Sequence, residues 1–159
     1  MGIGPSTKET SLHHFRDPLV DVLGEDEGID LMGVLVFGTP DGNKDKIRNS
    51  KRAAVVAECM RVDGAIVSSD GWGNSDVDYQ NCVKELDERG IAIAGLNFSG
   101  RIATFVVDNE ILHHNIVDIN KHPDGIESNV VGENNMTRED VKEALKILKV
   151  EMYKKAKAR

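Results

Sequence analysis

Short, continuous apolar runs alternate along this chain with longer stretches of helical periodicity, and this alternation limits its fold more than any other feature. The apolar runs lie at residues 33–38, 64–69 and 91–96. The stretches between them, 44–61 and 76–89, carry apolar residues at helical spacing. Runs that are apolar throughout are typical of strands that helices cover on both faces. The pattern therefore predicts βαβ units in a parallel sheet.

The signals for strands weaken beyond residue 100. We predict strands at 104–107 and 115–119. A polar stretch rich in Gly and Asn over residues 121–135 predicts a long loop, with room for a short strand near 130–131.

Capping residues mark the start of two further helices. Asp17 and Pro18 form an N-cap and first-turn pair, which predicts a short helix that ends near Leu23. Thr137 and Asp140 form an approximate capping box ahead of one apolar stripe, which predicts a helix from residue 137 onward.

Together these elements predict a single α/β domain over residues 1–159, a length that can bury a sizeable core. We expect a three-layer sandwich with a mostly parallel, Rossmann-like sheet. An N-terminal arm with the short helix occupies residues 1–30, and a long C-terminal helix occupies residues 137–159.

The charge of the chain restricts its partners. A formal net charge of −7 argues against nucleic-acid binding. No apolar run approaches the ~20 residues that span a bilayer, and residues 1–6 do not resemble a signal peptide, so we expect a cytoplasmic protein without membrane contact.

The charge is unevenly distributed along the chain: residues 142–159 carry +5 and residues 1–141 carry −12. The basic end is either a solvated helix with cations near its C-terminus or a docking helix for an acidic partner.

The two cysteines predict packing rather than chemistry. Cys59 and Cys82 fall in phase with apolar neighbours in predicted helices, which favours buried, inert thiols. They show no metal-ligand spacing, and no glycine-rich phosphate-binding motif follows a strand.

Three loops follow the predicted strands, and the carboxyl ends of parallel strands are where ligands gather. They span residues 38–43, 68–76 and 97–101. The second loop holds the only tryptophan, Trp72, between Gly71 and Gly73. Either these glycines let a ligand or partner approach while Trp72 packs against it, or the loop caps the next helix through Asn74 or Ser75 and Trp72 covers the sheet edge.

A second cluster precedes the short helix, where His13, His14 and Arg16 bring titratable and anion-pairing groups together. Adjacent histidines point apart in most backbone conformations, which argues against a metal site. Two roles remain for this cluster. One of the histidines caps a helix or donates to loop carbonyls, or the cluster contacts a substrate or another subunit.

Several of these segments occur together in one known family. Residues 10–14 (TSLHH), 17–20 (DPLV), 63–78 (with DGWGNSDVD at 70–78) and 116–121 (IVDINK) resemble the glycine/sarcosine/betaine and D-proline reductase family of Stickland fermentation. The likeness is to the C-terminal portion of the pyruvoyl-bearing proprotein. It implies reductive cleavage of a C–N bond, as in the opening of D-proline to 5-aminovalerate, with a pyruvoyl group and a selenocysteine as reactive groups.

The chain departs from the family at one decisive point. The family's pyruvoyl group arises from a cysteine just ahead of the segment that resembles residues 10–14, and residues 1–58 here contain no cysteine. The resemblance therefore implies a component of an oxidoreductase complex, D-proline reductase, that has no cofactor of its own and is inactive in isolation. Pyruvoyl and selenocysteine are expected on partner subunits, and a homo-oligomer is left open.

The alternatives are a catalytically inert paralogue that serves as an assembly or small-molecule-binding module, and a flavodoxin-like regulator. The resemblance and the topology rule together predict one rim for substrate or partner binding, with no metal ligand and no assigned catalytic residue. The rim comprises His13, His14, Arg16, Asp70, Gly71, Trp72, Gly73, Asn74 and Asp76.

Overall fold

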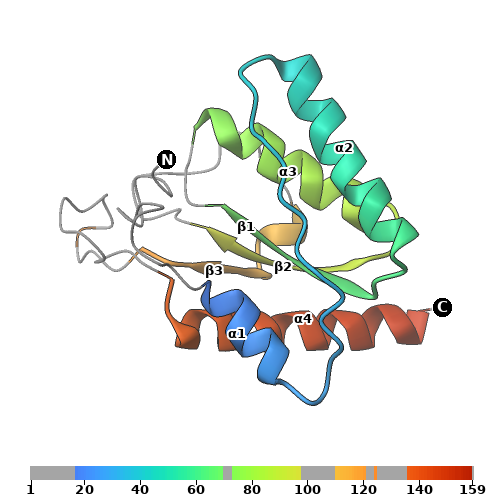
Figure 1. Cartoon of the computed structure of the whole chain (residues 1–159), viewed down its shortest axis with the longest axis vertical. Helices are drawn as coiled ribbons and strands as arrows, with labels where there is room; N and C mark the ends of the chain where they lie inside the picture. The colour runs from blue at the N-terminus through green and yellow to red at the C-terminus, as the bar shows by residue number, and fades with distance from the viewer. Residues whose placement is uncertain (1–16, 70–72, 98–109, 121–123, 125–135, 159) are drawn as a thin grey trace.

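The computed structural model describes residues 17–69, 73–97, 110–120, 124 and 136–158. A three-stranded sheet lies between two layers of helices, with α2 and α3 on one side and α1 and α4 on the other (Figure 1). The described elements are α1 (Pro18–Glu25), α2 (Asn43–Cys59), β1 (Gly64–Ser69), α3 (Asn74–Asp87), β2 (Ala92–Asn97), the short 3-10 helix η1 (Glu110–Leu112), β3 (Ile116–Asp118) and α4 (Arg138–Ala158). The predicted three-layer α/β architecture is confirmed.

The sheet is parallel and has the order β1-β2-β3. Gly64 pairs with Ala92 at the start of β1, and Ser69 pairs with Asn97 at its end. All six residues of the central strand β2 are buried. This burial explains why its first five residues are apolar instead of alternating with polar ones.

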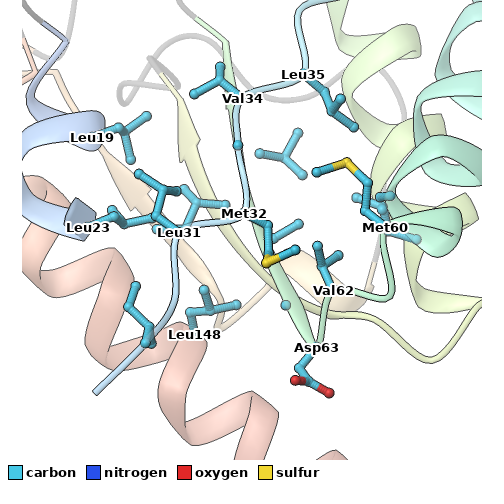
Figure 2. A pocket seen from close by; sticks show the side chains of 18 of the residues that line it. Leu19, Leu23, Leu31, Met32, Val34, Leu35, Met60, Val62, Asp63 and Leu148 are labelled. Atoms are coloured by element: carbon cyan, nitrogen blue, oxygen red, sulfur yellow. The ribbon is translucent and has the colours of Figure 1, made fainter. Parts of the chain in front are cut away.

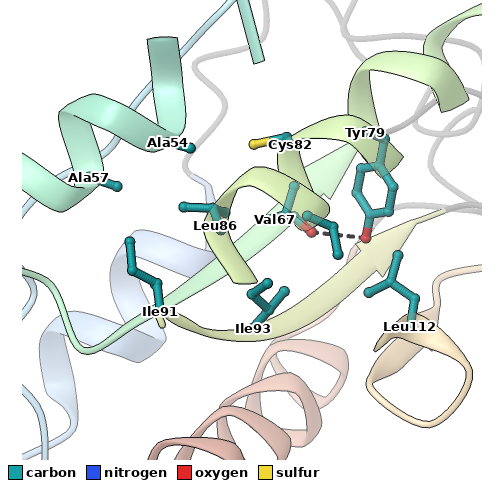
Figure 3. Packing of buried hydrophobic residues seen from close by; sticks show 10 residues of the cluster. Ala54, Ala57, Val67, Tyr79, Cys82, Leu86, Ile91, Ile93 and Leu112 are labelled. Carbon is teal, nitrogen blue, oxygen red and sulfur yellow. Dashed lines mark hydrogen bonds between the residues drawn. The ribbon is translucent and has the colours of Figure 1, made fainter. Parts of the chain in front are cut away.

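Each face of the sheet has its own apolar core. On one face, Ala92, Ala94 and Leu96 of β2 pack with α4 and with Val22 of α1. On the other face, Ile91 and Ile93 pack with α3, α2 and η1, as Figure 3 shows. Successive side chains of a strand point to opposite faces, so β2 serves both cores.

The predicted helix starts are confirmed. The Asp17 carboxylate accepts a hydrogen bond from the Leu19 N–H at 2.9 Å, which caps α1 ahead of Pro18. At α4, the Asp140 carboxylate accepts hydrogen bonds from the N–H and the hydroxyl of Thr137, at 2.8 and 2.7 Å. Each bond satisfies a donor at a helix end, which fixes where the helix begins.

The expected buried strand at 33–38 is wrong. The segment has no regular structure, and Val34, Leu35 and Val36 are exposed. It crosses beside β1 on its way from α1 to α2 (Figure 1). An apolar run of this length predicts burial only if its main chain pairs with the sheet, and the sheet contains β1, β2 and β3 without it.

The predicted inner face of α2 also needs correction. Ile47, Val55 and Cys59 are exposed, whereas Lys46 and Ser50 are buried together with Ala54 and Ala57. The polar residues are drawn inward because they find partners on α3, as described below. Cys59 is therefore not the buried thiol that its helical phase predicted.

Two predicted strands, at 104–107 and 130–131, lie outside the described residues. None of the helices in the described part of the chain combines the length and the apolar character needed to cross a bilayer.

Candidate functional site

Three polar residues meet at the carboxyl edge of the sheet. Ser69, Asn97 and Asp118 are in register as the last residues of β1, β2 and β3. Two residues earlier, the side chains of Val67 and Ile116 pack in the core that contains Tyr79 of α3, and the Tyr79 hydroxyl donates to the Val67 carbonyl at 3.2 Å. Because side chains two residues apart share a face, the polar row belongs to the face that Tyr79 covers.

Asn97 is the unusual member of this row. Its side chain is 0% exposed, and neither its amide nitrogen nor its amide oxygen has a hydrogen-bond partner among the described residues. A buried amide without partners costs roughly 1–3 kcal/mol. The amide of Asn97 therefore keeps one donor group and one acceptor that the described residues leave unused, in an enclosed position at the edge.

The N-terminus of α3 follows β1 at the same edge. Gly73 precedes the helix with φ +81°, a conformation that favours glycine. The fully buried Asp76 accepts the Gly73 N–H at 3.0 Å. A carboxylate already lies against the positive end of the helix, so this end is poorly suited to phosphate.

A buried ion pair joins α2 to α3. Lys46 and Asp78 are 0% and 1% exposed, and their Nζ and Oδ2 atoms are 2.6 Å apart. Nearby, the Asn81 amide donates to the Ser50 hydroxyl oxygen at 2.5 Å, and the Ser50 hydroxyl donates to the Lys46 carbonyl at 2.8 Å. Oδ1 of Asp78 has no hydrogen-bond partner within the described part of the molecule.

Sequence reasoning missed Lys46, although a signal was present. Residues 46, 50, 54 and 57 follow helical spacing and form the buried stripe of α2. A helix face is usually identified by its apolar residues, so a face that begins with Lys and Ser is not recognised as the buried one. Asn97 and Ser69 lay within predicted ligand loops, but neither was singled out.

The model for glycine/sarcosine/betaine reductase component B subunits matches residues 2–117. The chain belongs to this family. The match includes Ser69 and Asn97 of the carboxyl edge and ends one residue before Asp118.

Several curated members of the component B family are similar to the chain. It is 36% identical over 147 residues to the D-proline reductase proprotein PrdA of Acetoanaerobium sticklandii, which covers 92% of this chain and 23% of that protein. It is 29% identical over 103 residues to the sarcosine reductase complex component B subunit alpha of Peptoclostridium acidaminophilum, covering 62% of this chain and 24% of that protein.

A third relative is the glycine reductase complex component B subunits alpha and beta of Acetoanaerobium sticklandii, 33% identical over 87 residues, with coverage of 53% of this chain and 20% of that protein. The chain thus spans less than a quarter of the length of these three relatives. The search of solved structures finds no match.

The thiols of this component B homologue differ in their surroundings. Cys59 is exposed at the end of α2, and Cys82 is buried in α3. Burial, reinforced by the charge of Glu85, raises the pKa of Cys82 to about 12. Cys82 therefore stays a protonated packing group at neutral pH.

The structure describes part of the predicted rim. Gly73, Asn74 and Asp76 lie at the start of α3, with Gly73 as the N-cap in place of the predicted Asn74 or Ser75. The other predicted rim residues, His13, His14, Arg16, Asp70, Gly71 and Trp72, lie outside the described residues. Within the described ranges, no group of three His, Cys, Asp or Glu side chains could hold a metal ion.

Proposed function

We propose that this chain is a component of a D-proline reductase complex that carries no pyruvoyl group and no selenocysteine of its own. The observation that carries the proposal is the 36% identity over 92% of the chain to a D-proline reductase proprotein. The likeness to the sarcosine and glycine relatives is shorter, covering 62% and 53% of the chain. The proposed reaction is the reductive opening of the D-proline ring.

The cysteines of this chain do not fit the formation of a pyruvoyl group, and Ser6, which could cleave by the same acyl shift, has nothing in the sequence around it that demands such a step. The first cysteine in the sequence is Cys59, which lies at the end of α2 inside the folded domain. Chain cleavage there would cut the domain between α2 and β1. The electrophilic carbonyl and the selenol nucleophile are therefore assigned to partner subunits.

In this proposal the carboxyl edge of the sheet binds a polar group. The Asn97 amide donates to an oxygen or accepts from an N–H of the substrate or of a neighbouring subunit. The Lys46–Asp78 pair fixes α3 against α2, which positions the helix end that borders this edge. The chain then orients reactants without supplying a reacting atom.

The test is purification of the native enzyme through an affinity tag on this chain, from the anaerobe that encodes it, grown on D-proline. We expect the pyruvoyl-bearing and selenocysteine-bearing subunits to co-purify in stoichiometric amounts. The intact mass of the chain should correspond to an uncleaved polypeptide without a ketoacyl end. Deletion of the gene should reduce D-proline turnover.

Absence of the reductase subunits from the purified material would contradict the proposal. Unchanged turnover after deletion would favour the alternative of an inert assembly module. A ketoacyl end group on this polypeptide would show that it forms its own pyruvoyl.

A further inference from the structure

The β1 edge of the sheet has no partner strand among the described residues. The Ala92 N–H donates to the Asp63 carbonyl at 3.0 Å, so the main-chain groups of every second residue from Asp63 face β2. Those of Gly64, Ile66 and Ser68 therefore face away from β2. Within the described residues, β1 pairs with β2 alone. An unpaired strand edge of this kind is a template for another extended segment.

A groove of about 560 Å³ runs along this open edge. Its walls come from α1, the segment 29–37, the end of α2, β1, α3 and α4, and Figure 2 shows ten of the lining residues with labels. The side chains that line it are mostly apolar, and the labelled ones in Figure 2 are Leu19, Leu23, Leu31, Met32, Val34, Leu35, Met60, Val62, Asp63 and Leu148. The groove therefore offers an apolar wall on each side of free main-chain donors and acceptors.

The outer wall of the groove is exposed to an unusual degree for apolar residues. Val34 is 62% exposed and its neighbour Val36 is 92% exposed, and Met32 and Leu35 are exposed as well. Four large apolar side chains are thus exposed within five residues, and Met32, Val34 and Leu35 among them line the groove. Apolar side chains gathered at the surface in this way are typical of an interaction site.

The charges of the groove indicate what it accepts. Among the described residues, Asp17, Asp30 and Asp63 line it, and Arg61 is the one basic residue of the lining. An apolar segment with a basic residue at one end complements this lining. A second copy of the chain would place the same acidic lining against itself across a two-fold axis, which disfavours self-association.

The component B match shows where such a segment can come from. It spans residues 2–117 and so includes every part of the groove except the wall from α4, while the chain corresponds to only 23% of the D-proline reductase proprotein. The same groove region thus occurs in relatives within a much longer polypeptide.

We propose that the open edge of β1 and the segment 29–37 form a docking groove for an extended, apolar, basic-ended segment of the pyruvoyl-bearing reductase polypeptide. The segment adds to the sheet beside Ile66 and covers the exposed valines, as in strand addition. This inference rests on the proposed function, because it takes its partner from the reductase.

The test measures binding of the purified, processed D-proline reductase proprotein from the same organism to full-length variants of this chain. Val34→Asp places a charge in the groove at a side chain that the fold leaves exposed. Val150→Asp is the matched control, since Val150 is 52% exposed on α4 and does not line the groove. We expect the dissociation constant to rise about tenfold or more for Val34→Asp and to stay within about twofold for Val150→Asp.

Ser68→Pro supplies a second, independent variant. Proline removes an outward N–H that the β1–β2 ladder does not use, so the sheet should persist while strand addition is impaired. We expect weaker binding with an unchanged far-ultraviolet circular dichroism spectrum.

The outcomes separate the two proposals. If the unaltered chain does not bind the proprotein, both the proposed function and the groove are overturned. If it binds, and Val34→Asp and Ser68→Pro bind equally well, the groove alone is overturned. If the unaltered chain dimerises and Val34→Asp abolishes the dimer, the occupant is a second copy and the proposed partner segment is wrong.

Discussion

The two faces of the sheet are built on different principles. Under α4, the core consists of apolar side chains, and charged pairs such as Lys149 and Asp26 stay at the surface. The buried charged residue described on this side is Asp140, which caps the start of α4. On the α2 and α3 side, an apolar core of similar size is joined by buried polar groups: Lys46, Ser50, Asp76, Asp78 and Asn97. Both faces lie on the same strands, so the sheet itself does not impose the difference.

The difference indicates which side of the sheet serves stability alone and which side is a candidate for function. Apolar burial stabilises a fold without specifying chemistry, whereas buried charges and unpartnered amides carry a desolvation cost. Since the polar groups concentrate on the side of α3, which starts at the carboxyl edge, that side is the better candidate for function. The four predictions that follow test this contrast.

The largest effect is expected at the buried ion pair. Lys46→Met removes one charge and leaves the Asp78 carboxylate buried without its partner, which should lower the free energy of unfolding by about 3–5 kcal/mol. Urea denaturation followed by circular dichroism measures the change. As a control, Arg48→Met breaks the exposed pair with Asp45 and should cost less than about 1 kcal/mol.

A double variant sharpens this prediction. Lys46→Met combined with Asp78→Leu removes both charges, and should restore most of the lost stability. If the single and double variants are equally destabilised, packing rather than an uncompensated charge is responsible.

A smaller effect is expected where α3 approaches β2. A Cβ at Gly95 would lie 2.5 Å from the Tyr79 hydroxyl oxygen and 3.1 Å from the Leu112 side chain. Gly95→Ala should therefore displace Tyr79 and destabilise the fold by about 1–3 kcal/mol, measured by thermal unfolding. Gly24→Ala is the control, because a Cβ there meets nothing within 4 Å. Equal melting temperatures for the two variants would contradict the close approach.

The smallest effect is expected at the surface of the α4 side. The Lys149 ammonium, helped by the Gly28 N–H, holds the pKa of Asp26 below its usual value of 3.8. Its stabilising contribution is thus present above pH 3.8 and is lost as the pH falls through the lowered pKa. The stability difference between the unaltered protein and Asp26→Asn should shrink on acidification from about pH 5. A difference that grows at low pH would show that the sign is wrong.

Local signals predicted much of the fold. The bounds of β1 were predicted to the residue, and the caps at Asp17 and Thr137 were correct because each depends on a hydrogen bond within a few residues. The strand at 33–38 failed because pairing with β1 is a tertiary event that apolar composition does not encode.

The candidate site was less accessible to sequence reasoning. Its location at the carboxyl edge followed from topology. The burial of Lys46 did not follow from the sequence, because only the contact with Asp78, 32 residues away, explains it. Asn97 was expected in a loop, and only the register places it beside Ser69 and Asp118.

Asn97→Leu tests most directly whether the polar edge serves function at the expense of stability. The variant replaces an unpartnered buried amide with an apolar side chain, and it is measured by D-proline turnover in the complex reconstituted with the altered chain, alongside its melting temperature. The account predicts a raised melting temperature and a reduced turnover. Unchanged turnover would contradict it and would make Asn97 a structural residue of the sheet.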